Sequence, residues 1–184
     1  MRHPHQPRGP DGAAVPPGVS ARGVCGVIIR PARPEDAAAM ADLQNKIIRI
    51  GGTTAYQTER SVEAVRDYID GAGAICCFVA EAEGRLIGFQ ALGVWPGLPE
   101  GWGDIGTFVE PEVQAKGTGR ALFAATCAAA RAAGLETINA TIRADNAPGL
   151  AFYARQGFRD YGQEPEFRLL DGQCVGRVHR RFDL

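Results

Sequence analysis

The sequence predicts an α/β (α+β) domain in which a mixed sheet carries helices on both faces. Strand-like and helical segments follow one another in the order β-α-α-β-β-β-α-β-α-β-β. Two strands in the first half are joined by a direct hairpin, whereas long strand–helix–strand steps occur only in the second half. A length of 184 residues, 45% of them hydrophobic, suggests one domain with a sizeable core.

The first 26 residues differ in composition from the rest. They hold five of the 12 prolines and contain no Leu, Ile, Phe, Tyr or Trp. Such a segment buries too little apolar surface to offset its ordering entropy, and it lacks the apolar stretch of a secretory signal. We therefore expect a disordered N-terminal extension over residues 1–26 and one domain over residues 27–184.

The domain begins with a short strand and two helices. Residues 27–30 are rich in β-branched side chains and predict the strand, which Pro31 ends. Pro34 and the two acidic residues after it open a helix that continues to Gly51, because apolar side chains recur at helical spacing. Ser61 is a typical N-cap for a short second helix.

Three strands follow these helices. Residues 74–80 form a continuous apolar run, which is typical of a strand buried on both faces. Glu83 and Gly84 predict a hairpin turn into a return strand over residues 86–94. A Gly- and Pro-rich loop with both tryptophans separates this hairpin from a strand over residues 104–109.

Helices and strands alternate in the remaining sequence. An Ala-rich helix over residues 119–133 precedes a strand over residues 137–142. A short helix over residues 147–156 ends at Gly157. The last two strands are expected after Phe158 and over residues 173–182.

Composition excludes several classes of function. A formal net charge of −1 gives no electrostatic reason to bind a nucleic acid or a membrane surface, and no apolar run reaches the roughly 20 residues of a membrane span. The five cysteines have no zinc-ligand spacing, so we expect no metal and reduced thiols in a cytoplasmic protein. His179 is the only histidine beyond the first five residues, which argues against His-dependent nucleophilic catalysis. It belongs to a basic cluster over residues 177–181 that we expect at a solvated edge.

The most informative segment is residues 114–120, Gln-Ala-Lys-Gly-Thr-Gly-Arg, between a strand and a strong helix. Glycines at a helix start let the backbone approach a ligand closely, and the N–H groups there favour a phosphate or pyrophosphate. The segment lacks the Lys-Ser or Lys-Thr of a Walker A loop, and Leu122 stands where a dinucleotide fingerprint has its third glycine. The alternative is an ordinary Gly-rich turn.

The pattern Gln-x-x-Gly-x-Gly resembles the pyrophosphate-binding loop of the GNAT family of N-acetyltransferases. The family also has a Val-x-Pro step before this loop, matched by residues 108–111, Phe-Val-Glu-Pro. Asn146, Tyr153 and the Gly157–Phe158 step follow in the family's order and spacing. The resemblance covers residues 27–183, and within the family it extends to the small bacterial amino-acid and phosphinothricin N-acetyltransferases, through residues 51–56.

The resemblance implies the GNAT fold, with a mixed, mostly antiparallel sheet of six to seven strands. It implies acetyl-CoA as cosubstrate and a small-molecule amine as acceptor, an amino acid or an analogue, with a homodimer as the assembly. Residues implied in binding the cosubstrate are Phe108, Val109, Gln114, Ala115, Lys116, Gly117, Thr118, Gly119, Arg120 and Asn146. For Lys116 a solvated surface position is the alternative, and for Asn146 an N-cap of the following helix, which is compatible with binding.

The resemblance also implies the catalytic groups. Tyr153 is the candidate acid that protonates the leaving thiolate, and the alternative is an aromatic ring that packs its helix onto the sheet. Asp104 is the candidate base, directly or through water, and the alternative is a solvated carboxylate at a strand end. Thr53, Thr54 and Tyr56 are candidates for acceptor binding, or for packing beneath the helices.

Two other functions remain open at this stage. One is acetylation of a protein or peptide amine, which requires an open groove. The other is an acyl-CoA-binding sensor without turnover. The presence of both Asp104 and Tyr153 argues against the sensor.

Overall fold

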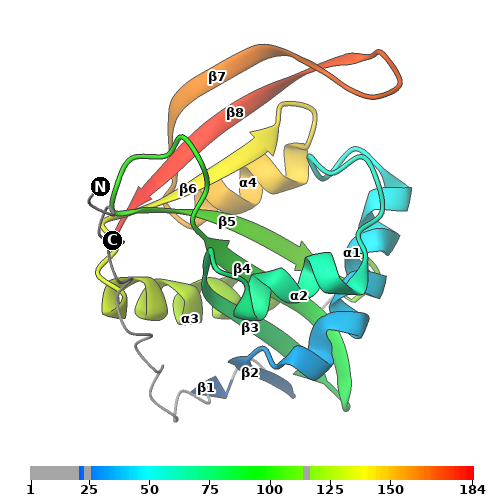
Figure 1. The fold of residues 1–184 in the computed structure, drawn as a ribbon, viewed down its shortest axis with the longest axis vertical. Coiled ribbons are helices and arrows are strands. Elements are labelled where there is room, and N and C mark those ends of the chain that lie inside the picture. Colours follow the sequence, from blue (N-terminus) through cyan, green and yellow to red (C-terminus); the bar gives the residue numbers. More distant parts are fainter. Residues whose placement is uncertain (1–20, 23–25, 114–116) are drawn as a thin grey trace, which may run out of the picture.

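A computed structural model describes residues 21–22, 26–113 and 117–184 and shows one sheet covered by helices on both faces (Figure 1). The strands are β1 (Ala21–Arg22), β2 (Val27–Pro31), β3 (Ala74–Ala82), β4 (Arg85–Gly93), β5 (Trp102–Val109), β6 (Thr137–Arg143), β7 (Arg159–Arg168) and β8 (Cys174–Asp183). The helices are the 3-10 helix η1 (Pro34–Asp36), α1 (Ala37–Ile50), α2 (Val62–Asp70), α3 (Thr118–Ala132) and α4 (Ala147–Arg155). The predicted order of elements is confirmed.

The strand order in the sheet is β1-β2-β3-β4-β5-β6-β8-β7. Only the β5–β6 pair is parallel, and the other pairs are antiparallel. The predicted fold, a mixed and mostly antiparallel sheet, is confirmed. The two-residue β1 adds an eighth strand to the seven that the sequence predicts, and it lies within the segment expected to be disordered.

The β3–β4 hairpin forms where the sequence predicts it. Glu83 and Gly84 both have positive φ angles, 52° and 73°, as a tight hairpin turn with the twist of the flanking strands requires. Both strands are largely buried, because they lie in the middle of the sheet between two layers of helices.

Two apolar clusters hold the helices on opposite faces of the sheet. Under α1 and α2, Met40 and Val65 pack against Val79, Phe89 and Phe108. The other cluster joins α3 and α4 to the second face, and its buried members include Leu122, Phe123, Ile138, Tyr153 and Phe158. Within the described residues, no helix is both long and apolar enough to cross a membrane.

The first prediction concerns this core. Phe89 is fully buried and stacks on Phe108, with ring centroids 4.7 Å apart. Phe89→Ala should lower the free energy of unfolding by about 3–5 kcal/mol, because it leaves a cavity between sheet and helices. Ile28→Ala is the matched control, since Ile28 is 50% exposed; its cost should stay below about 1 kcal/mol. Equal losses in urea denaturation would contradict this assignment of the core.

Candidate active site

The sheet opens between β5 and β6. Their parallel register covers only Trp102–Asp104 and Thr137–Asn139. Beyond that point β5 remains paired with β4 as far as Val109, and β6 remains paired with β8 as far as Arg143. The two strands therefore diverge, as Figure 1 shows, and both line a cavity of about 2040 Å³. This volume exceeds the roughly 300–1,000 Å³ of an ordinary ligand pocket, so the cavity has room for two substrates.

The opening connects the two faces of the sheet. Side chains alternate between faces along β5, so Asp104 shares a face with Phe108, which packs under α1 and α2. Thr107 shares the opposite face with Ile105, which packs on the α3 side. Groups from both faces line one cavity only because the strands part here.

Asp104 is half-buried in the wall of the cavity. Burial raises the pKa of its carboxyl group from 3.8 to about 6, while a hydrogen bond from Asn139 and the charge of His179 act in the opposite direction. The Asn139 Nδ2 donates to Asp104 Oδ1 over 2.5 Å. A carboxylate with this pKa can accept a proton near neutral pH.

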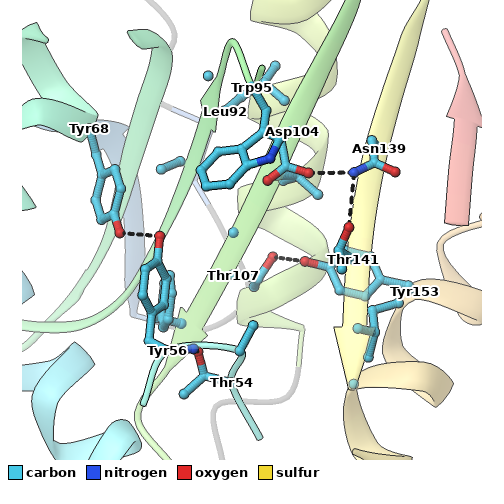
Figure 2. A pocket seen from close by; sticks show the side chains of 18 of the residues that line it. Thr54, Tyr56, Tyr68, Leu92, Trp95, Asp104, Thr107, Asn139, Thr141 and Tyr153 are labelled. Atoms are coloured by element: carbon cyan, nitrogen blue, oxygen red, sulfur yellow. Dashed lines mark hydrogen bonds between the residues drawn. The ribbon is translucent and has the colours of Figure 1, made fainter. Parts of the chain in front are cut away.

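Asn139 joins Asp104 to a polar network on β6, β7 and β8, of which Figure 2 shows the bonds from Asn139 to Asp104 and Thr141. Its Nδ2 also reaches Thr141 Oγ1 at 3.3 Å, and its Oδ1 accepts a hydrogen bond from Tyr161 Oη at 2.6 Å. The Thr141 hydroxyl lies 3.0 Å from His179 Nδ1, and His179 Nε2 lies 3.0 Å from Glu164 Oε1. The side chain of Asn139 is thus fixed on both sides, and Asp104 is fixed with it.

Tyr153 extends from α4 into the same cavity. Its side chain is buried, and its hydroxyl lies 2.9 Å from Thr107 Oγ1. Burial raises the pKa of its phenol above the usual value, whereas the hydrogen bond with Thr107 lowers it. The hydroxyl is therefore protonated at neutral pH and available as a proton donor.

The start of α3 forms a cradle beside the cavity. Gly117 has a φ of 97° as the residue before the helix, a conformation that favours glycine. A Cβ at Gly119 would lie 2.7 Å from Cε2 of Phe152, so the helix and this ring meet at van der Waals distance. The N–H groups at the start of a helix favour an anion. Gln114, Ala115 and Lys116, predicted for the same role, lie outside the described residues.

Asn146 connects α4 to the loop between α1 and α2. Its Oδ1 accepts a hydrogen bond from Gly149 N at 2.9 Å, as an N-cap, and its Nδ2 donates to the Thr53 carbonyl at 2.8 Å. A Cβ at Gly149 would lie 2.4 Å from Nδ2 of Asn146, which explains a glycine there. Asn146 thus uses its amide within the chain, and its predicted contact with a cosubstrate stays a prediction.

Two tyrosines form the cavity wall on the side of α1 and α2. Tyr68 Oη donates to Tyr56 Oη over 2.8 Å, and the buried Gln44 donates to Tyr68 Oη over 3.2 Å. The backbone N–H of Tyr56 donates to Thr54 Oγ1 (Figure 2). The Tyr56 ring also packs near Phe108 and under the Arg60 guanidinium.

The structure brings nearly all described candidates together. Those that line the cavity are Thr53, Thr54, Tyr56, Asp104, Phe108, Val109, Gly117, Gly119, Arg120, Asn146 and Tyr153. Thr118 is buried as the first residue of α3 and is not part of the cavity lining. Among the described residues no group of three metal-ligating side chains gathers.

Three polar residues that line the cavity were not predicted from the sequence: Thr107, Asn139 and Tyr161. The signal for Asn139 was present, because Thr137, Asn139 and Thr141 alternate with apolar residues along β6 and so share one face. The expectation that residues 177–181 lie at an edge is wrong, because β8 lies between β6 and β7 in the sheet. Arg177 and His179 line the cavity.

The acetyltransferase (GNAT) family model matches residues 39–158. The chain therefore belongs to the GNAT acetyltransferase family. A mycothiol acetyltransferase from Clavibacter michiganensis subsp. michiganensis is 39% identical over 95 residues, which cover 52% of this chain and 30% of that protein. The chain thus spans about a third of the length of this relative. An aminoglycoside N(6')-acetyltransferase type 1 from Stenotrophomonas maltophilia is 29% identical, over 77% of this chain and 92% of that one.

Solved structures share the fold. A putative acetyltransferase from Salmonella typhimurium, solved with its cofactor acetyl-CoA, superposes with a TM-score of 0.78 at 21% identity, covering 87% of this chain and 95% of that one. A putative phosphinothricin N-acetyltransferase has a TM-score of 0.73 at 21% identity, with 86% and 98% covered. These likenesses confirm the GNAT fold, and the expected placement near the phosphinothricin enzymes stays a prediction.

The raised pKa of Asp104 predicts a stability gain for Asp104→Asn. Since the folded chain ionises Asp104 near pH 6 and the unfolded chain near 3.8, the carboxyl group destabilises the fold increasingly as pH rises through this window, and fully above it. Asp104→Asn keeps an oxygen for the Asn139 bond. It should raise the free energy of unfolding by roughly 1–3 kcal/mol at pH 8.

Below about pH 3.5 the two proteins should be equally stable, because Asp104 is then protonated in both folded and unfolded chains. Urea denaturation at both pH values measures the difference. A destabilised Asp104→Asn protein at pH 8 would contradict the buried environment described for this carboxyl group.

Proposed function

We propose that this chain transfers an acetyl group from acetyl-CoA to the primary amine of a small molecule, an amino acid or an analogue. The observation that carries the proposal is the opening between β5 and β6, where Asp104 and Tyr153 line one cavity with the glycine turn of α3. Membership of the GNAT family supports acetyl transfer. The mycothiol and aminoglycoside relatives support a small acceptor and make amino sugars the second acceptor class to test.

The described residues fit acetyl-CoA. Gly119 lets the start of α3 pack closely against the Phe152 ring, and the N–H groups at the start of a helix favour a phosphate group. The edge of β5 that β6 leaves from Ile105 onward offers the main-chain groups of alternate residues, including Val109, to an extended amide-bearing arm, whereas those of Phe108 point to β4. When bound, acetyl-CoA supplies an activated acetyl thioester.

The two catalytic groups act on protons at opposite ends of the transfer. Asp104 accepts a proton from the ammonium form of the acceptor, which makes the amine nucleophilic. Tyr153 gives the proton of its hydroxyl to the departing sulfur. Because Asp104 and Thr107 lie on different faces of the sheet, the amine approaches from the α1–α2 side and the thioester from the α3–α4 side.

The main test is release of free thiol from acetyl-CoA across a panel of amino acids, amino sugars, polyamines and peptides. Asp104→Asn and Tyr153→Phe should each lower kcat about 10²- to 10⁴-fold. For the wild-type protein, kcat/KM should rise with pH up to about 6, where Asp104 becomes ionised. Unchanged turnover in the double variant would refute the assigned roles. Binding of acetyl-CoA without turnover on any amine would favour a sensor, and turnover confined to peptides would favour a protein acetyltransferase.

A separate prediction addresses the cradle at α3. Gly119→Ala should weaken acetyl-CoA binding by about tenfold or more, because the new methyl group pushes the Phe152 ring toward the cavity. Isothermal titration calorimetry measures the affinity. Gly134→Ala is the control, since its added methyl group meets no atom within 4 Å and its positive φ costs only local strain. Equal affinities for the wild type and Gly119→Ala would place the cosubstrate elsewhere.

A further inference from the structure

A hydrogen-bonded relay leads from the middle of the sheet to Tyr153. Gln90 on β4 lies directly opposite Thr107 on β5 in the antiparallel register. Gln90 is fully buried, and its Nε2 lies 2.8 Å from Thr107 Oγ1. Thr107 Oγ1 lies 2.9 Å from Tyr153 Oη, so the three side chains form a continuous chain (Figure 2 shows its last step).

The direction of the first bond follows from the surroundings of Gln90. Its Oε1 is buried and has no hydrogen-bond partner among the described residues. If the oxygen and nitrogen of the amide changed places, two unpaired N–H groups would stand where there is now one unpaired oxygen. That arrangement would be less favourable. Gln90 therefore donates to Thr107, and Thr107 uses one of its two lone pairs to accept.

The direction of the second bond is fixed once Tyr153 has lost its proton. A phenolate oxygen has no hydrogen, so the only hydrogen between the two oxygen atoms is then that of the Thr107 hydroxyl. Thr107 can donate this hydrogen to the phenolate, because its oxygen already accepts a hydrogen bond from Gln90. A hydrogen bond to an ionised oxygen is about twice as strong as a neutral one.

We propose that Thr107 is a positioning residue for Tyr153: it donates a hydrogen bond to the phenolate oxygen while Gln90 holds the threonine hydroxyl in place. The proposal rests on the proposed function. In the step concerned, the O–H bond of Tyr153 breaks, an S–H bond forms on the departing thiolate, and the negative charge moves to the phenolate. The amine nitrogen loses a proton when the amide forms. Water then carries a proton back to Tyr153, so that the proton count balances.

The relay answers a physical difficulty at this site. Tyr153 is buried among Phe152 and Phe158, an environment that opposes a phenolate and raises the pKa of the phenol. The negative charge of Asp104 also raises the pKa of the phenol. Among the neighbours that shift this pKa, only the Thr107 hydroxyl favours the ionised form.

Three variants test the proposal. Thr107→Val keeps the size and shape of the side chain but removes the hydroxyl, and it should lower kcat about 10- to 100-fold with little change in KM for either substrate. Thr107→Ser retains the hydroxyl and should restore most of the lost rate. In a Tyr153→Phe background Thr107→Val should have no further effect, because the group it serves is absent.

A second readout does not depend on turnover. In protein made with difluorotyrosine, whose phenol is more acidic, fluorine NMR follows each tyrosine through its titration. The resonance missing from Tyr153→Phe identifies Tyr153. Its pKa should rise by about one unit in Thr107→Val and remain unchanged in Thr107→Ser.

The outcomes separate this proposal from the proposed function. Additive losses in the double variant, or an unchanged pKa of Tyr153 in Thr107→Val, would overturn the role of Thr107 while acetyl transfer by the wild type stands. Absence of acetyl transfer on every amine would overturn the proposed function, while the fluorine titration still decides the relay. If the valine variant does not fold, Gln90→Met interrupts the relay from its other end, and a smaller pKa rise of the same sign is expected; no rise would overturn the proposal.

Discussion

The structure depends on the point at which β5 and β6 stop pairing. Their last register pair is Asp104 with Asn139, and the side chains of the same two residues are hydrogen bonded. Beyond this pair β5 continues to pair with β4, and β6 continues to pair with β8. The sheet therefore opens at a fixed residue, and the carboxylate of Asp104 lies where the opening begins.

Because of this opening, the two faces of the sheet contribute different groups to one cavity. The α1–α2 face contributes Tyr56, Tyr68 and Asp104 to the cavity, while the α3–α4 face contributes the glycine turn, Phe152 and Tyr153. In an intact sheet, a layer of backbone would separate Asp104 on one face from Tyr153 on the other. Parallel pairing that ends early removes this layer without loosening the core, because both apolar clusters extend beneath the neighbouring strands.

The sequence predicted what depends on local chemistry. Pro34, Ser61, the Glu83–Gly84 turn and the glycines at 117 and 157 punctuate the chain, and each marks an element boundary in the structure. The additional strand β1 was not predicted, because pairing with β2 rather than composition defines it. The hydrogen-bond partners of Asp104 and Tyr153, the candidate catalytic residues, were not predicted for the same reason. Gln90 and Thr107 are 17 residues apart, and only the strand register places them side by side.

The buried glutamines indicate what this site requires. Gln44 and Gln90 are both fully buried, each has an Oε1 atom without a partner in the described part of the chain, and each donates through its Nε2 to a hydroxyl group. An unsatisfied buried oxygen costs about 1–3 kcal/mol, so an apolar side chain of similar size would give a more stable protein. In both cases the receiving hydroxyl bonds to a tyrosine that lines the cavity, Tyr56 or Tyr153. The two unsatisfied oxygen atoms thus lie at the buried ends of two hydrogen-bonded relays that orient tyrosine hydroxyls in the cavity. Such a loss of stability is expected at a functional site.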